Sequence, residues 1–377
     1  MERPKKSYGN TRVDFEVYHS LAQIPGEFES LFKEAAKESV FFAEEWFRRS
    51  VEHFIRAPQS LRIFAAKIDG IPIALLFVVE TPLTQKAPWL KRSVLSSCTT
   101  SQSFRSSLVC STHCDVVELL IALTRYLDET KYSFHKLDLD LLSFSEQEQE
   151  RWTQELAKAC VPASIVQQEW NRFEDVSGVP FSKIAKKSTK RRQKKLEKDF
   201  QVGFRLYQKP DEIHEAIEAY EDIYQRTWKE ADVGKTFAAD VIHDYARRDW
   251  VKFLVMTVDA RPVAAECFFV HNRKACSFRT AYDLDYRDYS VGSIVLQKMF
   301  ELLKKDDLID EIDFGPGDEE YKKQWLKQRR PLWRLQIFSL SSKLSRSDYF
   351  LCQAQERFRL INQFLLFPSQ QYFRKTM

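Results

Sequence analysis

The sequence predicts an α/β protein with a mixed α+β sheet, arranged as two related domains in tandem and followed by a helical tail. Three observations lead to this prediction. Segments with strand-like patterns alternate with segments of helical spacing. The order hairpin, helix, strand, helix occurs once in each half of the chain. The 377 residues exceed the usual size of one core, and the 44% of hydrophobic residues are ample for a packed interior.

The first half is predicted to form a domain over residues 13–175. A polar lead precedes its first helix, and Asp69-Gly70 is typical of a tight turn between two strands. A loop rich in Ser and Thr is expected over 93–111. The predicted elements are a helix over 41–54, strands over 61–68 and 71–79, a helix over 116–130, a strand over 135–142, a helix over 147–160 and a strand over 164–173.

The second half is predicted to form a domain over residues 201–344 with the same order of elements. Its expected elements are helices over 211–228 and up to about 250, strands over 252–259, 262–271 and 275–282, a helix over 294–305, a strand over 312–314, a helix over 319–327 and a strand over 332–340.

Two further segments lie outside these domains. Residues 176–200 are predicted to be a basic connecting helix, with nine Lys or Arg between Ser182 and Asp199. Such a run indicates either a contact with phosphate or nucleic acid, or a solvated connecting helix. The tail, residues 345–377, has an amphipathic pattern that includes Tyr349 and Phe350. We expect it to pack against the body of the protein, because its polar face is mixed in sign.

The composition limits the classes of function. The chain has 58 basic and 54 acidic residues, a net charge of +4 that alone indicates neither nucleic acid nor membrane. Seven scattered cysteines and no recognisable signal peptide predict a reduced, cytoplasmic protein. The longest apolar stretch, about 71–79, is far shorter than the roughly 20 residues of a transmembrane helix. No transmembrane segment is expected, and no oligomeric state is predicted.

A phosphate-binding turn is predicted before the helix over 294–305. The preceding polar stretch contains one glycine, Gly292, and we expect the helix to start just after it with Ser293 as the N-cap. The first turn of a helix leaves N–H groups unpaired at the positive end of the helix dipole, so a small residue there lets a phosphate approach closely. The predicted binding residues are Ser290, Val291, Gly292, Ser293 and Ile294.

Several short motifs resemble those of GNAT-type acyltransferases, in the branch named for cellulose-biosynthesis acetyltransferases, which is related to the Fem aminoacyltransferases. The motifs are the basic run 190–196, Pro262-Val263-Ala264-Ala265, Ala281-Tyr282-Asp283, Tyr289-Ser290-Val291-Gly292-Ser293, and Asp313-Phe314-Gly315-Pro316-Gly317-Asp318 followed by Tyr321-Lys322 and Trp325. The resemblance covers residues 180–340 well and the first half only by its pattern.

This resemblance implies two GNAT-like domains, of which the N-terminal one is degenerate. It also implies transfer of an acyl group from acetyl-CoA or another acyl-CoA. One motif departs from the family pattern, because the phosphate loop Gln/Arg-x-x-Gly-x-Gly/Ala is matched here only at its central glycine, Gly292.

Acyl transfer needs a base for the nucleophile, donors for the oxyanion and an acid for the departing thiolate. Glu266 is the candidate base. Strand alternation places it on one face with Ala264 and Phe268, and apolar neighbours raise the pKa of a carboxylate toward the range of a general base. The alternative is a paired glutamate with a structural role.

Tyr321 is the candidate acid, because the resemblance implies a tyrosine here that protonates the CoA sulfur. The alternative is a core aromatic pair with Trp325, one helical turn away. Asp283 ends a strand beside the phosphate turn and is expected to orient the acceptor, unless it is simply a strand-end residue. Tyr282, Lys322 and Trp325 are the candidate substrate-binding residues, with Lys322 holding a phosphate or an acidic acceptor.

Other kinds of site have little support. Cys110, His113 and Cys114 fall short of the four ligands of a structural zinc site, so no metal is expected. The chain contains neither a Gly-x-Ser-x-Gly nucleophile elbow nor a P-loop.

The leading functional hypothesis is an acyl-CoA-dependent N- or O-acyltransferase that acts on a saccharide precursor, as in polysaccharide biosynthesis, or on another small amine or hydroxyl acceptor. A second is Fem-like transfer of an aminoacyl group from tRNA, indicated by the basic helix over 183–198, although nucleic acid is the less favoured partner. A third is a non-catalytic adaptor on a degenerate acyltransferase fold.

Overall fold

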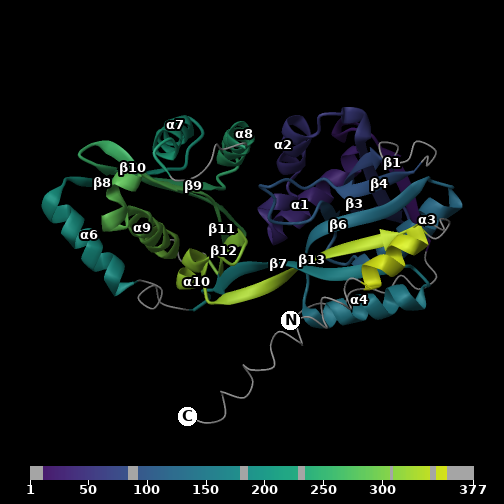
Figure 1. The fold of residues 1–377 in the computed structure, drawn as a ribbon. Coiled ribbons are helices and arrows are strands. Elements are labelled where there is room, and N and C mark those ends of the chain that lie inside the picture. The colour runs from purple at the N-terminus through teal and green to yellow at the C-terminus, as the bar shows by residue number, and fades with distance from the viewer. Residues whose placement is uncertain are drawn as a thin grey trace, which may run out of the picture.

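The computed structural model describes residues 12–83, 92–178, 186–227, 234–305, 309–339 and 345–354. These residues form one mixed sheet of 13 strands in the order β1-β2-β3-β4-β6-β13-β7-β12-β11-β10-β9-β8, with β5 paired to β3 beside this path. Figure 1 shows the sheet running through the whole molecule. The predicted mixed α/β class is confirmed.

The first half supplies seven strands and four α-helices of the described chain. They are β1 (Val13–Tyr18), α1 (Glu29–Glu38), α2 (Glu44–Phe54), β2 (Leu61–Ile68), β3 (Ile71–Pro82), β4 (Ser93–Ser97), β5 (Leu108–Cys110), α3 (Val116–Glu129), β6 (Phe134–Ser143), α4 (Glu146–Lys158) and β7 (Ala163–Asp175).

The second half begins with the basic helix. Its elements are α6 (Lys187–Asp199), β8 (Val202–Tyr207), α7 (Ile213–Tyr224), α8 (Lys235–Ala246), β9 (Val251–Val258), β10 (Arg261–His271), β11 (Lys274–Tyr282), the 3₁₀ helix η6 (Leu284–Tyr289), α9 (Val291–Lys305), β12 (Glu311–Pro316), α10 (Glu320–Trp325) and β13 (Gln328–Phe338).

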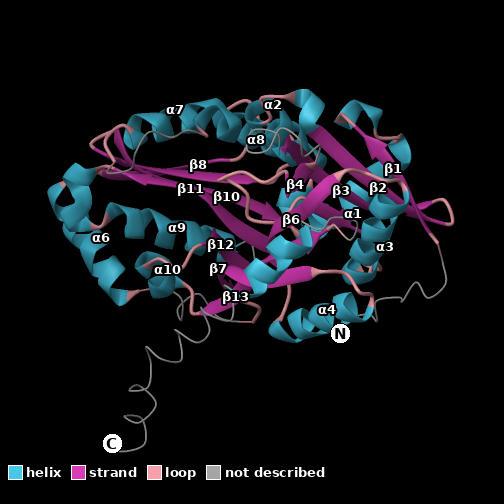
Figure 2. Ribbon diagram, turned by 45° about the vertical axis from the view of Figure 1, so that its right-hand side comes forward, coloured by secondary structure: helices cyan, strands magenta, loops and turns pink. Residues whose placement is uncertain are grey.

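Helices cover both faces of the sheet, as Figures 1 and 2 show. Helices α1, α2, α7 and α8 lie on one face, where their aromatic side chains pack on β2, β3, β9 and β10. Helices α3, α4, α6 and α9 lie on the other face with α10. The candidate site residues belong to this second face.

The two halves repeat one topology and exchange a strand. In each half a helix links two parallel neighbours, β4 with β6 and β11 with β12. The last strand of the first half, β7, pairs with β12 of the second half, while β13 inserts between β6 and β7. The tandem repeat is therefore confirmed. The boundary expected at 175–201 separates the two repeats along the sequence, but the sheet continues across it because β7 pairs with β12 and β13.

Several local expectations are confirmed. Strands β2 and β3 form the predicted hairpin, and Asp69 and Gly70 both have positive φ values of 51° and 77°, as a type I′ turn requires. The basic segment is helical over Lys187–Asp199. The described part of the tail, 345–354, is helical and packs on the body, with the rings of Tyr349 and Phe338 5.8 Å apart. The rest of the tail lies outside the described residues.

Other expectations are wrong. The segment 93–111 contains strands β4 and β5, and the polar lead contains β1 and α1. Strand β8 was not predicted. Helix α2 starts at Glu44 rather than at 41, because Ala43 is extended with φ −69° and ψ 149°.

Candidate functional site

The parallel strands β11 and β12 separate after a short paired stretch. Their register covers only Lys274 with Glu311, Ala275 with Ile312, and Cys276 with Asp313, whereas β11 continues to Tyr282. Where they separate, β11 carries one extra residue relative to β10, Phe278, which is a β-bulge. Ligands in α/β proteins bind beyond the carboxyl ends of parallel strands, and bulges are common beside such sites.

Glu266 lies on β10 next to this point of separation. It faces Thr280 across the β10–β11 ladder, and the Thr280 hydroxyl donates a hydrogen bond of 2.6 Å to the Glu266 carboxylate. The side chain is 3% exposed. Ala264 and Phe268 pack in the core beneath α9, so the expected sharing of a face by these three residues is confirmed. Its role as a base stays a prediction.

Tyr321 lies in the first turn of α10 on the same face. Its ring stacks on Phe314 with centroids 6.4 Å apart, and the residue is 48% exposed. Desolvation of the hydroxyl, followed by the negative charges of Glu319 and Glu266, raises the pKa of Tyr321 well above its usual value. The hydroxyl is therefore protonated at neutral pH, as a general acid must be.

The turn before α9 differs from the prediction in its register. The helix begins at Val291, directly after Ser290 in a left-handed conformation (φ 55°, ψ 48°). The amides of Ser293 and Ile294 donate to the Ser290 carbonyl at 2.9 and 3.1 Å, so the assignment of Ser293 as the N-cap is wrong. Within the described chain the amides of Val291 and Gly292 have no acceptor. The turn therefore offers two main-chain donors rather than the whole stretch 290–294 that was predicted, and two such donors fit a phosphate group.

Gly292 lies against the ring of Tyr282. A Cβ atom at position 292 would lie 3.0 Å from Cδ1 of Tyr282, closer than a side-chain contact normally allows. The glycine thus lets the last residue of β11 pack against the first turn of α9. Tyr282 is half-buried and lies opposite Ala264, on the same face as Glu266.

Three other candidates are held by structural contacts. Asp283 is 1% exposed and accepts from Arg226 Nε at 2.6 Å and Arg261 Nη2 at 3.1 Å. Lys322 is buried, donates to the Pro316 carbonyl and pairs with Glu319 at 3.1 Å. Trp325 packs edge-on against Phe300 with centroids 5.5 Å apart. Their proposed contacts with substrate stay predictions.

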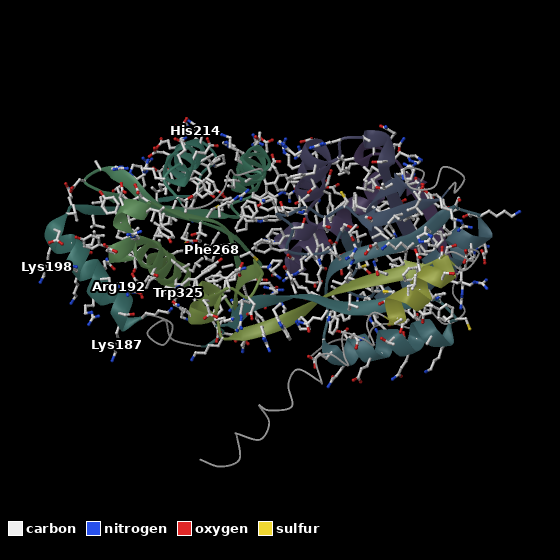
Figure 3. All side chains as sticks on the ribbon, in the orientation of Figure 1. Lys187, Arg192, Lys198, His214, Phe268 and Trp325 are labelled. Atoms are coloured by element: carbon white, nitrogen blue, oxygen red, sulfur yellow. The ribbon has the colours of Figure 1, made fainter. Side chains whose placement is uncertain are left out.

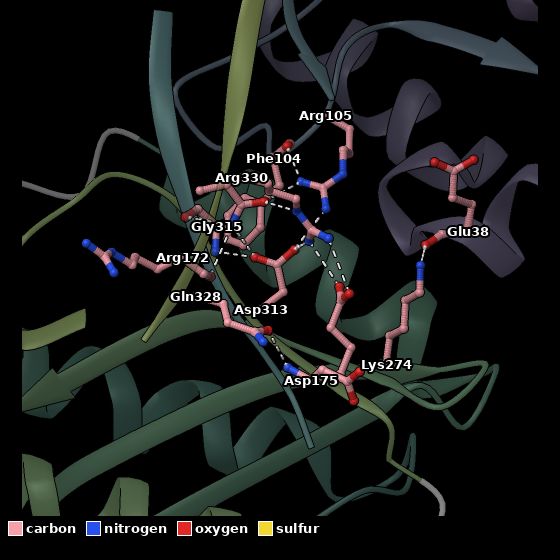
Figure 4. A network of polar contacts seen from close by, with 12 residues as sticks. Glu38, Phe104, Arg105, Arg172, Asp175, Lys274, Asp313, Gly315, Gln328 and Arg330 are labelled. Atoms are coloured by element: carbon pink, nitrogen blue, oxygen red, sulfur yellow. Dashed lines mark hydrogen bonds and ion pairs between the residues drawn. The ribbon is translucent and has the colours of Figure 1, made fainter. Parts of the chain in front are cut away.

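A buried polar network, which the sequence analysis missed, surrounds Asp313 (Figure 4). Asp313 pairs with Arg105 at 2.8 Å and with Arg330, and it accepts hydrogen bonds from Asn171 Nδ2 at 2.6 Å and the Gly315 amide at 2.7 Å. Burial alone would raise the pKa of Asp313, but the two guanidinium charges and these hydrogen bonds outweigh it and hold the pKa well below its usual value. The Asp313–Asp318 motif therefore joins the two halves.

The first half lacks an open helix terminus at the corresponding position. Helix α3 follows Asp115, whose carboxylate accepts from the amides of Val117 at 3.2 Å and Glu118 at 3.4 Å. Arg151 pairs with the same carboxylate at 2.8 Å. A carboxylate already occupies this terminus, so a phosphate would be repelled there.

The basic helix α6 packs beside α9 and presents its cations to solvent. The Tyr289 hydroxyl donates to Asp199 at 3.1 Å, and Gln297 of α9 accepts from the Lys186 amide at 2.9 Å. Figure 3 shows the labelled side chains of α6 pointing away from the body. Seven exposed cations against two acids give the helix a net charge of +5, more than the +4 of the whole chain. The cations are Lys187, Lys190, Arg191, Arg192, Lys194, Lys195 and Lys198.

The described residues contain no cluster of three or more His, Cys, Asp or Glu side chains able to hold a metal ion. They also contain no helix long and apolar enough to cross a membrane.

Comparisons with known proteins agree with this architecture. Residues 183–323 match the family model described as acetyltransferase (GNAT) domain. A conserved protein of unknown function from Bacteroides thetaiotaomicron VPI-5482 has a similar structure, with a TM-score of 0.53 and 10% identity, covering 84% of this chain and 98% of that protein. FemX has a TM-score of 0.53 and 11% identity, covering 89% of this chain and 100% of FemX. None of the curated proteins matches the sequence.

At sequence identities of 10% and 11%, the similarity to these solved structures shows the fold alone. The chain therefore shares the fold of these two structures, and its residues 183–323 match an acetyltransferase (GNAT) domain, which supports an acyltransferase.

Proposed function

We propose that the protein is an acyl-CoA-dependent N- or O-acyltransferase whose active site lies in the second half. One observation carries this proposal: the Glu266–Thr280 pair, Tyr321 and the start of α9 lie on one face, where β11 and β12 separate. In this proposal Glu266 is the base, Tyr321 is the acid, and the start of α9 supplies main-chain donors for a phosphate of the acyl donor.

In this proposal Glu266 accepts the proton of the attacking amine or hydroxyl as the nucleophile adds to the thioester carbonyl. The carbon–sulfur bond then breaks, and Tyr321 gives its proton to the departing sulfur. The hydroxyl of Tyr321 keeps its proton at neutral pH, which this role requires. The Thr280 hydrogen bond fixes the orientation of the Glu266 carboxylate.

The remaining candidates receive supporting roles. The amides of Val291 and Gly292 hold a donor phosphate, with Ser290, Ser293 and Ile294 shaping the turn. Tyr282 borders the acyl donor through its contact with Gly292.

The contacts of the last three candidates favour positioning roles. Asp283 fastens the end of β11 through Arg226 and Arg261. Lys322 and Trp325 hold α10, and with it Tyr321, in place. A saccharide precursor and the cellulose-biosynthesis branch remain the proposed acceptor class and subgroup.

Titration calorimetry with acetyl-CoA and longer acyl-CoAs tests the proposed donor. We expect saturable binding by at least one of them. Absence of binding by all of them up to about 1 mM, equivalent to a binding free energy weaker than about −4 kcal/mol, would reject the proposal.

A second candidate function is transfer of an aminoacyl group from tRNA, favoured by the exposed charge of α6. Its test is the affinity for aminoacyl-tRNA at several salt concentrations. Phosphate contacts release counterions, so the affinity should fall steeply with salt. Binding that is absent or independent of salt would eliminate this candidate.

A further inference from the structure

The first half contains two adjoining cavities beside the starts of α3 and α4, and the inner one also reaches Glu38 at the end of α1. The inner cavity has a volume of about 330 Å³ and the outer one about 1620 Å³. They share the lining residues Thr112, Ser143, Phe144 and Glu148, so they form one groove that deepens toward the core. We call it the first-half groove.

The first-half groove occupies the position that corresponds to the proposed active site. Strands β4 and β6 are parallel and paired from Ser93 to Ser96 with residues 134–138, after which β6 continues to Ser143. The groove lies at the carboxyl end of β6, because Leu141, Leu142 and Ser143 line it. Each half thus keeps a site beyond the ends of its own parallel pair.

The ligand of this groove is not a phosphate. Asp115 lines the outer cavity and caps α3, and the capping box of Ser145 and Glu148 closes the start of α4. Both helix termini that face the groove therefore already carry a carboxylate.

Two buried polar groups at the inner cavity have no hydrogen-bond partner within the described chain. They are the Ser106 hydroxyl and the Trp152 indole N–H, in residues that are 5% and 3% exposed. An unsatisfied buried polar group costs roughly 1–3 kcal/mol, so its retention beside a cavity points to a partner that is not part of the chain.

The charges of the groove favour a cation. Four arginines line it, and each is already paired with a carboxylate: Arg105, Arg151, Arg329 and Arg330. His113 also lines the outer cavity. Glu38 in the inner cavity and Glu146 in the outer one form no ion pair with another described residue. Figure 4 shows the Glu38 carboxylate directed away from the network around Asp313.

We propose that the first-half groove binds a ligand that carries a protonated primary amine, as in an amino sugar or a short peptide. Glu38 and Glu146 attract the ammonium group, while Ser106 and Trp152 pair with neighbouring polar atoms of the ligand. This binding site is distinct from the proposed active site in the second half and does not rest on the proposed transferase function.

The test measures binding of two amines to the full chain without any acyl donor. Glucosamine and glycylglycine are titrated and observed by ligand NMR, each beside its N-acetylated form, which lacks the charge. We expect at least one amine to bind and its N-acetylated form to bind at least about tenfold more weakly. Binding by neither amine up to about 10 mM, or equal binding of the neutral forms, overturns the proposal.

Matched variants locate the site. Glu38→Gln and Trp152→Phe should each weaken amine binding by about three- to tenfold, the effect of one lost polar contact. Glu218→Gln on α7 and Trp250→Phe, whose ring stacks on His271 on the other face, should not. Unchanged amine binding in both groove variants contradicts the proposal. Glu38→Gln changes an exposed side chain, so its amine affinity still tests the site if Trp152→Phe does not fold.

The outcome is separable from that of the proposed function. Amine binding with no acyl-CoA binding would leave the groove as an amine site and reject the transferase. Acyl-CoA binding without amine binding would keep the proposed transferase function and reject the amine site.

Discussion

The guanidinium of Arg105 and the carboxylate of Asp313 form a buried ion pair, with 2.8 Å between Nη2 and Oδ2. Arg105 belongs to a loop of the first half and Asp313 to strand β12 of the second. Asn171 on β7 and Arg330 on β13 join the same network, so both exchanged strands are tied to it. The two halves therefore depend on one another, and we expect them to unfold together.

Replacing Asp313 should destabilise both halves at once. Asp313→Ala leaves the largely buried guanidinium of Arg105 without a carboxylate and leaves Arg330 with Glu311 alone, a change that costs about 3–5 kcal/mol. Unfolding in guanidinium chloride, followed by fluorescence and circular dichroism, should show one transition shifted to lower denaturant. Asp310→Ala, which breaks the exposed pair with Arg273, should cost at most about 1 kcal/mol. Two separate transitions would contradict the account.

The same carboxylate predicts a dependence of stability on pH. The pKa of Asp313 is lower in the folded than in the unfolded protein, so its stabilising contribution is complete above the unfolded value of about 3.9 and is lost as the pH falls toward the folded value. The difference in free energy of unfolding between wild type and Asp313→Asn should therefore shrink below about pH 4. A constant difference from pH 7 to pH 3 would disagree with the assigned shift.

The proposed base and acid should affect turnover more than binding. Glu266→Gln and Tyr321→Phe should each lower kcat by about 10²- to 10⁴-fold, while acyl-CoA affinity stays within about threefold of wild type. Because the pKa of Tyr321 is raised, the rate should not fall near pH 10, where an ordinary tyrosine ionises. Thiol release from acyl-CoA measures both effects. Unchanged kcat in both variants would contradict the assignment of base and acid, and no thiol release by the wild-type protein would instead favour the adaptor hypothesis.

Much of this architecture follows from sequence patterns. The hairpin around Asp69-Gly70 was predictable because only a few residues accept positive φ in a two-residue turn. Long helices such as α3 and α9 have clear apolar periodicity. Strand β4 was hidden because Ser93 and Ser97 occupy two of its three buried positions, so it has little apolar pattern of its own. Strand β5 is only three residues long.

The candidate site was predictable only in part. Strand alternation placed Glu266 on the correct face, but no local signal indicates its hydrogen bond with Thr280. The side-chain partners of Asp313 lie 17 to 208 residues away, so only the fold brings them together. The motif Asp313–Asp318 contributed only to the family resemblance, and nothing in it indicated that its first carboxylate holds the exchanged strands. The register of α9 depends on the left-handed Ser290, which serine adopts rarely.

Gly292 offers a test of the turn before α9. Gly292→Ala places a methyl group 3.0 Å from the Tyr282 ring, which must move. Alanine favours helix over glycine by up to about 1 kcal/mol, so we expect little loss of stability but weaker acyl-CoA binding. The double variant with Tyr282→Ala should relieve the contact. Thermal denaturation and calorimetry distinguish these effects, and normal acyl-CoA affinity in Gly292→Ala would show that the turn does not touch the donor.

Loss of the cap on α3 should leave donor binding unaffected. Asp115→Ala removes an N-cap and the partner of Arg151, which should reduce the free energy of unfolding by about 1–2 kcal/mol. Because the donor site is assigned to the second half, acyl-CoA affinity should stay unchanged. A large loss of acyl-CoA affinity in a folded Asp115→Ala protein would move the donor site to the first half.

The stoichiometry of acetyl-CoA binding tests the central claim most directly, since only the second half has an open helix start beside its separated strands. Equilibrium dialysis with radiolabelled acetyl-CoA should give one bound molecule per chain, and Gly292→Ala should weaken that single site. Two equivalent molecules per chain, or one whose affinity is insensitive to Gly292→Ala, would contradict the account.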